Sequence, residues 1–478
     1  MGSAMPTTLM RGILAPLICL SLLSLPGCNT DTCVTCTAEV GGTISGLGPN
    51  ESLTLLNNGG DALSISDDGA FTFSVSQVAG STYDVTVRSH TPGIACAVSN
   101  GSGTIGLSNP ASVAVSCAGG TETVLHSFTD STDGANPNAG LVMDSAGNFY
   151  GTTMFGGTNG SGTVFKISPA GLETVLYSFS ELNFPQAGLT IDKAGNLYGT
   201  TSGGVAGGTV LKVSPAGAAT VLYSFAGGAT DGAHPWAALT MDSGGNLYGT
   251  TTEGGANDAG TVFKIGVTGK ESILHFFTGG ATDGAHPHAA LIIDSSGNLY
   301  GTTTEGGAND AGTVFKIGVT GKESILHFFT GGATDGAVPV AGLVMNSVGD
   351  LYGTTSSGGA YDDGTVFEIS ATGTETVVYS FAGGATDGAY PDAALIMDSA
   401  GSLYGTTTNG GANDAGTVFK ISPTGTETVL YSFAGDVTDG HTDGSRPQSL
   451  ILDSAGNIYG TSASGGAYSS LGTVFMIN

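Results

Sequence analysis

The 478-residue sequence predicts an all-β fold, because one segment recurs seven times and each copy contains several short β-type runs. One Tyr in each copy marks the period, with successive spacings of 48, 50, 52, 52, 52 and 55 residues. A period near this length is typical of propellers and solenoids. Gly and Pro together make up 98 of 478 residues (82 and 16), which is below the roughly 25–30% typical of disordered chains. The marker residues are Tyr150, Tyr198, Tyr248, Tyr300, Tyr352, Tyr404 and Tyr459.

The charge of the chain limits its partners. Lys and Arg number 11 against 39 Asp and Glu, and the formal net charge is −28. Such a chain is repelled by nucleic-acid phosphates and by anionic membrane surfaces. We therefore expect no nucleic-acid partner, and cations or neutral polar ligands fit better.

The N-terminus predicts export. Met10-Arg11 is a short charged start, residues 13–25 form an apolar run, and Leu25-Pro26-Gly27-Cys28 resembles the cleavage site of bacterial lipoproteins. Residues 1–27 are therefore interpreted as a lipoprotein signal, Cys28 as the lipidated residue and 28–36 as a tether. Asn29 is not the Asp of the usual inner-membrane retention signal, which favours the outer membrane or cell surface. Ordinary secretion with Cys28 in a disulfide is the alternative.

Residues 37–118 predict a small Ig-like β-sandwich. Short alternating runs such as residues 70–75 and 83–87 are separated by turn signals such as Asn58-Gly59-Gly60. Cys96 and Cys117 lie on the last two predicted strands, and an exported domain is where a disulfide persists. Residues 119–121 are the expected linker.

Residues 122–478 predict a seven-bladed propeller of four-stranded blades. In one copy the four strands are expected at residues 375–381, 393–398, 403–407 and 417–421. The region begins with the strand that is last within a blade, and it ends with the strand that comes just before that one in every other repeat. Strand 122–128 is therefore expected to complete the last blade. An open stack is the alternative, but it needs capped ends.

The ordered set Asp-Gly-Ala-x-Pro, Gly-Asn-Leu-Tyr-Gly-Thr-Thr and Gly-Thr-Val-Phe-Lys-Ile resembles the GloVer tandem repeats of exported bacterial choice-of-anchor proteins. The resemblance covers residues 121–478. It implies attachment at the cell surface and no defined activity. More distantly, the strand–turn–strand segment is similar to NHL and gluconolactonase-type propellers.

The candidate ligand site consists of the residues that flank the loop Pro. The rest of the repeat is nearly constant, whereas these positions change from copy to copy, which indicates either free surface or an asymmetric binding surface at the channel mouth. The pairs are Asn136 and Asn138, Phe184 and Gln186, His234 and Trp236, His286 and His288, Val338 and Val340, Tyr390 and Asp392, and Arg446 and Gln448. The residues expected to bind the ligand are Asn136, Asn138, His234, Trp236, His286, His288, Tyr390, Asp392 and Arg446.

Metal binding is a secondary prediction. Asp436, Asp439 and Asp443 share the longest loop with two glycines, which suits Ca²⁺ but has no EF-hand spacing, so a solvated acidic loop is the alternative. A second hypothesis joins His234, His286 and His288 to nearby Asp residues. By contrast, the strand histidines at 126, 275 and 327 occupy a Tyr position and are expected to pack with one polar contact. Apart from calcium, no cofactor is expected.

Two functions fit these observations. The first is a monomeric, membrane-anchored, non-catalytic propeller that binds a polysaccharide or a protein through its long-loop face. The second is an exported hydrolase or lyase with His234, His286 or His288 as base. The sequence contains no nucleophile motif, so binding is preferred.

Overall fold

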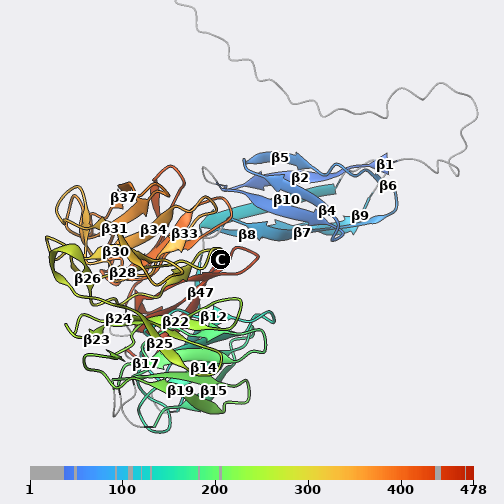
Figure 1. Ribbon diagram of the computed structural model, residues 1–478. Helices are drawn as coiled ribbons and strands as arrows, with labels where there is room; N and C mark the ends of the chain where they lie inside the picture. The colour runs from blue at the N-terminus through green and yellow to red at the C-terminus, as the bar shows by residue number, and fades with distance from the viewer. Residues whose placement is uncertain are drawn as a thin grey trace, which may run out of the picture.

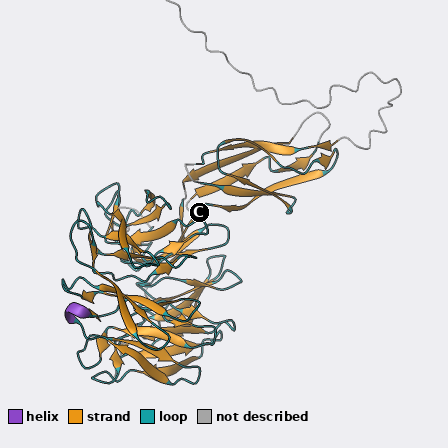
Figure 2. Cartoon of the chain, turned by 45° about the horizontal axis from the view of Figure 1, so that its top comes forward, coloured by secondary structure: helices purple, strands orange, loops and turns teal. Residues whose placement is uncertain are grey.

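The computed structural model describes residues 37–47, 51–91, 94–105, 111–119, 121–129, 132–180, 184–203, 207–435, 443–468 and 470–478. Regular structure in these ranges is β-strand apart from one 3-10 turn, η1 (Gly280–Thr282) (Figure 2). The all-β prediction is confirmed. None of the described residues forms a helix with the length and apolar character needed to cross a membrane. The predicted signal and tether lie outside the described residues, together with Cys28, Cys33 and Cys36.

The small N-terminal domain contains two four-stranded sheets that share one core (Figure 1). Alternate residues of its strands point inward, so that Leu53 and Leu55 are buried against Phe73. Cys96 and Cys117 lie opposite each other on neighbouring strands and form a disulfide. The first sheet has the order β5 (Gly69–Thr72), β2 (Val40–Ser45), β10 (Ala111–Gly119) and β8 (Ile94–Ser99). The second has the order β4 (Asp61–Ile65), β3 (Leu53–Asn57), β7 (Thr82–His90) and β9 (Ser102–Thr104), and β1 (Thr37–Ala38) pairs with β6 (Gln77–Val78).

The repeats form a series of antiparallel sheets, six with four strands and the last with five. Each sheet contains a two-residue strand, here called the inner strand, and a six-residue strand at the opposite edge, here called the outer strand. The outer strand begins the next copy of the sequence repeat. The first three sheets are β12 (Val142–Met143), β13 (Phe149–Thr153), β14 (Thr163–Ile167), β15 (Glu173–Ser178); β16 (Thr190–Ile191), β17 (Leu197–Thr201), β18 (Thr209–Val213), β19 (Ala219–Ser224); and β21 (Thr240–Met241), β22 (Leu247–Thr251), β24 (Thr261–Ile265), β25 (Glu271–Phe276). The next three are β27 (Ile292–Ile293), β28 (Leu299–Thr303), β30 (Thr313–Ile317), β31 (Glu323–Phe328); β33 (Val344–Met345), β34 (Leu351–Thr355), β36 (Thr365–Ile369), β37 (Glu375–Ser380); and β39 (Ile396–Met397), β40 (Leu403–Thr407), β42 (Thr417–Ile421), β43 (Glu427–Ser432).

The last sheet combines the two ends of the repeat region. β11 (Glu122–Ser127) pairs antiparallel with β47 (Thr473–Ile477), which continues to β46 (Ile458–Ser464), β45 (Ile451–Leu452) and β44 (Ser445–Pro447). The sheet also packs on the first one, because Phe128 and Val474 share a buried cluster with Leu141 and Phe165. The repeat sheets therefore form a closed series.

The loops carry short ladders of their own, which the sequence pattern did not predict. In each ladder, the Gly-Ala before the loop Pro pairs with the residues that follow the Gly-Thr-Thr strand. The ladders are β20 (Gly232–Ala233) with β23 (Glu253–Gly254), β26 (Gly284–Ala285) with β29 (Glu305–Gly306), β32 (Gly336–Ala337) with β35 (Ser357–Gly358), and β38 (Gly388–Ala389) with β41 (Asn409–Gly410).

Hydrogen bonds explain the constant turn in six of the seven repeats; in the remaining one Asn346 replaces the Asp and Tyr352 donates to Glu368. Asp294 Oδ1 accepts from the backbone N–H groups of Ser296 and Asn298, and Asp294 Oδ2 accepts from the Asn298 amide and the Tyr300 hydroxyl. Gly301 is required because a Cβ there would lie 2.7 Å from a ring carbon of Phe315. Asp, Asn, Tyr and Gly thus fix one turn and its packing, and this turn belongs to the scaffold.

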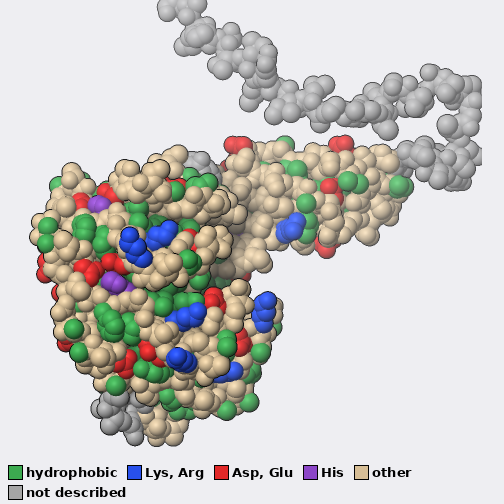
Figure 3. Space-filling view, in the orientation of Figure 1, with side chains coloured by type: hydrophobic (Ala, Val, Ile, Leu, Met, Phe, Trp, Pro, Cys, Tyr) green, Lys and Arg blue, Asp and Glu red, His purple; other side chains and the backbone are tan. Residues whose placement is uncertain are grey.

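The small domain contacts the face that carries these turns, here called the short-turn face. The His90 N–H donates to the carbonyl of Ala455, which lies in the last such turn, at 3.1 Å. The Pro loops lie at the other end of the inner strands and define the long-loop face. Figure 3 shows mostly uncharged surface on the side drawn, with acidic and basic side chains in small scattered groups.

Candidate ligand-binding site

The residue before the loop Pro has a left-handed backbone in all seven repeats. Its φ lies between 46° at Phe184 and 57° at Val338, although none of the seven is Gly. A β-branched residue such as Val338 rarely adopts this conformation. The residues are Asn136, Phe184, His234, His286, Val338, Tyr390 and Arg446.

Hydrogen bonds between sheets hold this conformation. The N–H of His286 donates to the carbonyl of Ala259 in the preceding repeat at 2.9 Å, and its carbonyl accepts from the Thr304 N–H at 3.3 Å. Val338 makes the corresponding bonds to Ala311 and Ser356. The backbone before the Pro therefore connects neighbouring repeats, which explains why a strained φ is retained whatever the side chain.

Three of the predicted site residues direct their side chains to these inter-repeat contacts. Nδ1 of His234 lies 2.7 Å from the Ser202 carbonyl, and Nδ1 of His286 lies 2.8 Å from the Thr252 carbonyl. The Asn136 amide donates to the Ala463 carbonyl at 2.9 Å. These contacts place Asn136, His234 and His286 outside the lining of the central cavity described next.

The residue after the Pro lines one cavity in every repeat. This cavity, of about 760 Å³, opens at the long-loop face. Its lining residues are Asn138, Gln186, Trp236, His288, Val340, Asp392 and Gln448 after the Pro, Tyr390 and Arg446 before it, and Ser356, Thr408, Asn409 and Ala463 at strand ends. The position after the Pro thus lines the cavity in every repeat, whereas the position before it does so only at Tyr390 and Arg446.

The cavity combines aromatic and hydrogen-bonding groups. The Trp236 and His288 rings meet edge to face with centroids 5.6 Å apart, and 41% of the Trp236 surface remains exposed. Tyr390 is equally exposed, at 41%. Thr408 donates to the Asp392 carboxylate at 3.5 Å. Exposed aromatic faces beside planar amides and a carboxylate suit a ligand with both apolar and hydroxyl-bearing surfaces.

The surroundings change the ionisation of two cavity residues. The Asp392 carboxylate faces the cavity and is in contact with solvent. The many protein atoms around it nevertheless disfavour its charged form and raise its pKa to about 6, whereas the Thr408 hydrogen bond has a smaller, opposite effect. Burial, and secondarily the nearby His286, lowers the pKa of His288. At neutral pH the cavity therefore holds a neutral imidazole and the Asp392 carboxylate.

The predicted calcium loop is described only at Asp443. Its carboxylate is buried, with 8% of the residue exposed, and accepts from the Tyr431 hydroxyl at 2.7 Å and the Ala434 N–H at 2.9 Å. Asp436 and Asp439 lie outside the described residues. Asp443 thus lies between sheets, as do Asp283 and Asp387.

Six further residues line the cavity beyond those predicted to bind the ligand and Asn409. Gln186, Val340 and Gln448 line it because they follow the Pro, as Trp236 does. Ser356, Thr408 and Ala463 directly follow the constant Gly-Thr-Thr or Gly-Thr-Ser strand, so their position in the pattern could have identified them.

Comparison with known protein families identifies a family whose repeat matches this sequence. The model of the Gloeobacter/Verrucomicrobia repeat matches residues 74–292 and 240–475, so the match starts inside the small domain. No curated protein matches the chain. Similar solved structures include a gluconolactonase-like protein (14% identity, TM-score 0.39, covering 76% of this chain and 92% of that one).

Two further solved structures resemble this chain at a similar sequence identity and TM-score. One is the extracellular domain of a hybrid two-component system from B. thetaiotaomicron (13% identity, TM-score 0.46, 79% of this chain and 43% of that one). The other is a 6-phosphogluconolactonase-like protein from Bacteroides fragilis (20% identity, TM-score 0.42, 64% and 84%). Similarity at this level does not determine an activity. The family match, which spans most of the sequence and all seven repeats, does determine membership: the chain belongs to the Gloeobacter/Verrucomicrobia repeat family.

Proposed function

We propose that residues 122–478 form a seven-bladed β-propeller that binds a polysaccharide at the mouth of its central channel, without catalysis. The observation that carries this proposal is the cavity to which the residue after the Pro in all seven repeats contributes. Constant residues build the turns and the strand contacts, while the residues that differ between repeats line one concave surface. An unconstrained surface position would not need to converge on a cavity.

The lining favours a glycan over a charged ligand. Trp236 and Tyr390 offer exposed aromatic faces for the apolar side of a sugar ring, and Asn138, Gln186 and Gln448 offer amides for its hydroxyl groups. The net charge of −28 also disfavours an anionic ligand.

The test is binding of neutral oligosaccharides to the full chain by isothermal titration calorimetry after a glycan-array screen. We expect Trp236→Ala to weaken the affinity for a hit at least tenfold, which corresponds to about 1.4 kcal/mol. Val319→Ala is the matched control, because Val319 is also exposed but lies beside the short turns. Equal affinity of the Trp236 variant and the control contradicts the proposal. A protein ligand that binds while glycans do not, or turnover of a hit that is lost in His288→Ala, replaces it.

We further propose that the protein is held at the cell surface through a lipid on Cys28, with an Ig-like small domain as the spacer. Attachment of that domain to the short-turn face supports this, because the cavity then opens on the opposite face. We expect Cys28→Ser to move the protein from the membrane to the soluble fraction, measured by fractionation and immunoblotting. A variant that stays with the membrane refutes the anchor.

A further inference from the structure

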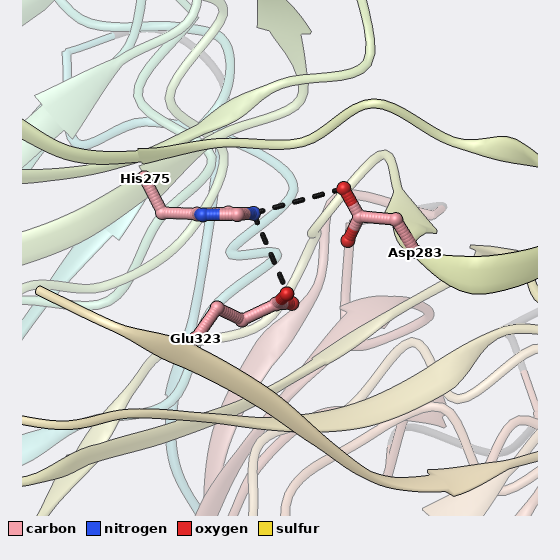
Figure 4. A group of neighbouring side chains, drawn as sticks. All are labelled: His275, Asp283 and Glu323. Atoms are coloured by element: carbon pink, nitrogen blue, oxygen red, sulfur yellow. Dashed lines mark ion pairs between the residues drawn. The ribbon is translucent and has the colours of Figure 1, made fainter.

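A cluster of three metal-ligating side chains lies between two neighbouring repeat sheets, away from the central cavity. His275 projects from β25, Asp283 from the loop that follows it, and Glu323 from β31 of the next sheet (Figure 4). Nε2 of His275 lies 3.7 Å from Asp283 Oδ2 and 3.8 Å from Glu323 Oε1. All three ligand atoms lie within 4.8 Å of one another.

The cluster is largely buried, and two of its polar atoms lack a hydrogen-bond partner among the described residues. The side chains of His275, Asp283 and Glu323 are 19%, 10% and 15% exposed. Within the described ranges, the buried atoms His275 Nε2 and Glu323 Oε1 have no hydrogen-bond partner. A buried polar atom without a hydrogen-bond partner destabilises the folded state. An ion bound between these atoms would remove that destabilisation.

One ligand is already oriented by the protein. Asp283 Oδ2 accepts from the N–H and the hydroxyl of Thr278, both at 2.7 Å, and Asp283 Oδ1 accepts from the Gly284 N–H. A carboxylate held in this way loses little freedom when it binds a metal. Because Oδ2 already accepts two hydrogen bonds, one of the bonds from Thr278 has to give way when this oxygen binds an ion.

The same arrangement recurs one repeat later, and other repeats show what replaces it. His327, Asp335 and Glu375 form a second group of this kind. Where the strand histidine is Tyr, the hydroxyl donates to the Asp, as Tyr223 does to Asp231 at 3.1 Å and Tyr379 to Asp387 at 3.0 Å. A Tyr repeat thus satisfies its Asp with a hydroxyl group, whereas a His repeat presents an imidazole nitrogen. In the second cluster this nitrogen, His327 Nε2, lies 3.3 Å from Asp335 Oδ1, within hydrogen-bond distance.

We propose that the two His-Asp-Glu clusters each bind one Zn²⁺ ion that links adjacent sheets. Zn²⁺ takes imidazole nitrogen and carboxylate oxygen at about 2.0–2.2 Å, which sets neighbouring ligand atoms roughly 3.3–3.6 Å apart. The separations of 3.7 and 3.8 Å need to shorten only slightly. The third ligand comes from the following sheet, so the ion strengthens the contact between repeats, and water completes the coordination.

The test measures zinc bound to the full chain after removal of metal with a chelator and titration with ZnCl₂, followed by elemental analysis, calorimetry and thermal melting. We expect the wild type to bind two more zinc ions per chain than the double variant described next. We also expect its melting temperature to be higher with zinc than without it. The matched variant is His275→Tyr with His327→Tyr, because Tyr occupies the same position at 223, 379 and 431. It should fold with an unchanged circular dichroism spectrum and lose both equivalents, and the single variant should lose one.

A second variant keeps the test decisive if the tyrosines disturb folding. Glu323→Gln with Glu375→Gln preserves shape and removes one anionic ligand from each cluster. We expect it to weaken zinc binding by more than the roughly 10–100-fold that the loss of an outer-shell partner costs. Zinc stoichiometry and affinity that are the same in the wild type and in a folded variant overturn the proposal, as does a wild type that binds no zinc.

Discussion

Replacing Phe128 with alanine is expected to destabilise the repeat region by roughly 3–5 kcal/mol, as truncation of a buried Phe does within a core. Phe128 follows β11, is 0% exposed, and its ring centroid lies 5.1 Å from that of Phe165 in the first sheet. Phe225 has the equivalent position between two consecutive sheets, also at 0%, and 4.9 Å from Phe263. Because the last sheet contacts the first in the same way, both substitutions should cost a similar amount.

The measurement is denaturant and thermal unfolding of the full chain, with Phe225→Ala as the internal reference. Deletion of residues 122–128 removes the whole strand that pairs with β47, and its midpoint should fall below that of Phe128→Ala. In an open stack, β11 would be a terminal strand whose loss is local. A near-native midpoint for Phe128→Ala beside a large drop for Phe225→Ala would therefore contradict the closed series.

Thermal stability should fall as the pH rises from 4.5 to about 8. Four outer-strand glutamates lie between sheets, and burial, followed by repulsion from a nearby Asp, raises their pKa from 4.5 to about 8 for Glu122 and about 7 for Glu173, Glu271 and Glu427. The folded state keeps protons that the unfolded state releases above pH 4.5. This stability is therefore fully present below pH 4.5 and is lost as the pH passes through 7 to 8.

Each of these glutamates lies near an aspartate that is itself hydrogen-bonded. Glu427 faces Asp387, which accepts from the Tyr379 hydroxyl, and Glu122 faces Asp443, which accepts from Tyr431. Glu427 Oε1 is among the buried atoms that have no hydrogen-bond partner in the described part of the chain. A proton on the glutamate relieves the repulsion between the two carboxylates.

A glutamine at these positions mimics the protonated acid. The combined variant Glu173→Gln, Glu271→Gln and Glu427→Gln should flatten the decline of the melting temperature above pH 6, and the exposed Glu39→Gln serves as control. The trend reverses in acid, because hydrogen bonds from Asn148 and Tyr150 outweigh burial and lower the pKa of Asp144, so its contribution is lost as the pH falls below 3.8. An identical pH slope in the triple variant and the control contradicts this account.

The predicted strands follow closely from local pattern. The expected strands at residues 403–407 and 417–421 coincide with β40 and β42, because each is a short run rich in β-branched and aromatic residues that fits a sheet buried on both faces. The inner strand is shorter than expected, Ile396–Met397 rather than 393–398, because the residues before it enter the loop that holds the Pro.

The candidate site was only partly predictable. Variation between copies identified both residues beside the Pro, but it could not distinguish them. The first position has a left-handed backbone in every repeat, and there Asn136, His234 and His286 bond to the neighbouring repeat. Tyr390 and Arg446 have the same backbone conformation but line the cavity, as Trp236 and His288 do. Such a conformation has no sequence signature when the residue is not Gly.

The sequence by itself determined the all-β character, the repeat and its period, because these depend on local alternation and turn residues. The tertiary structure decided which positions meet: the residues after the Pro around one cavity, and His275, Asp283 and Glu323 between two sheets. Their ligand atoms are brought together by sheet packing across 48 residues of chain, from His275 to Glu323. No local preference encodes a contact of that kind, because it is fixed only when one repeat is buried against the next.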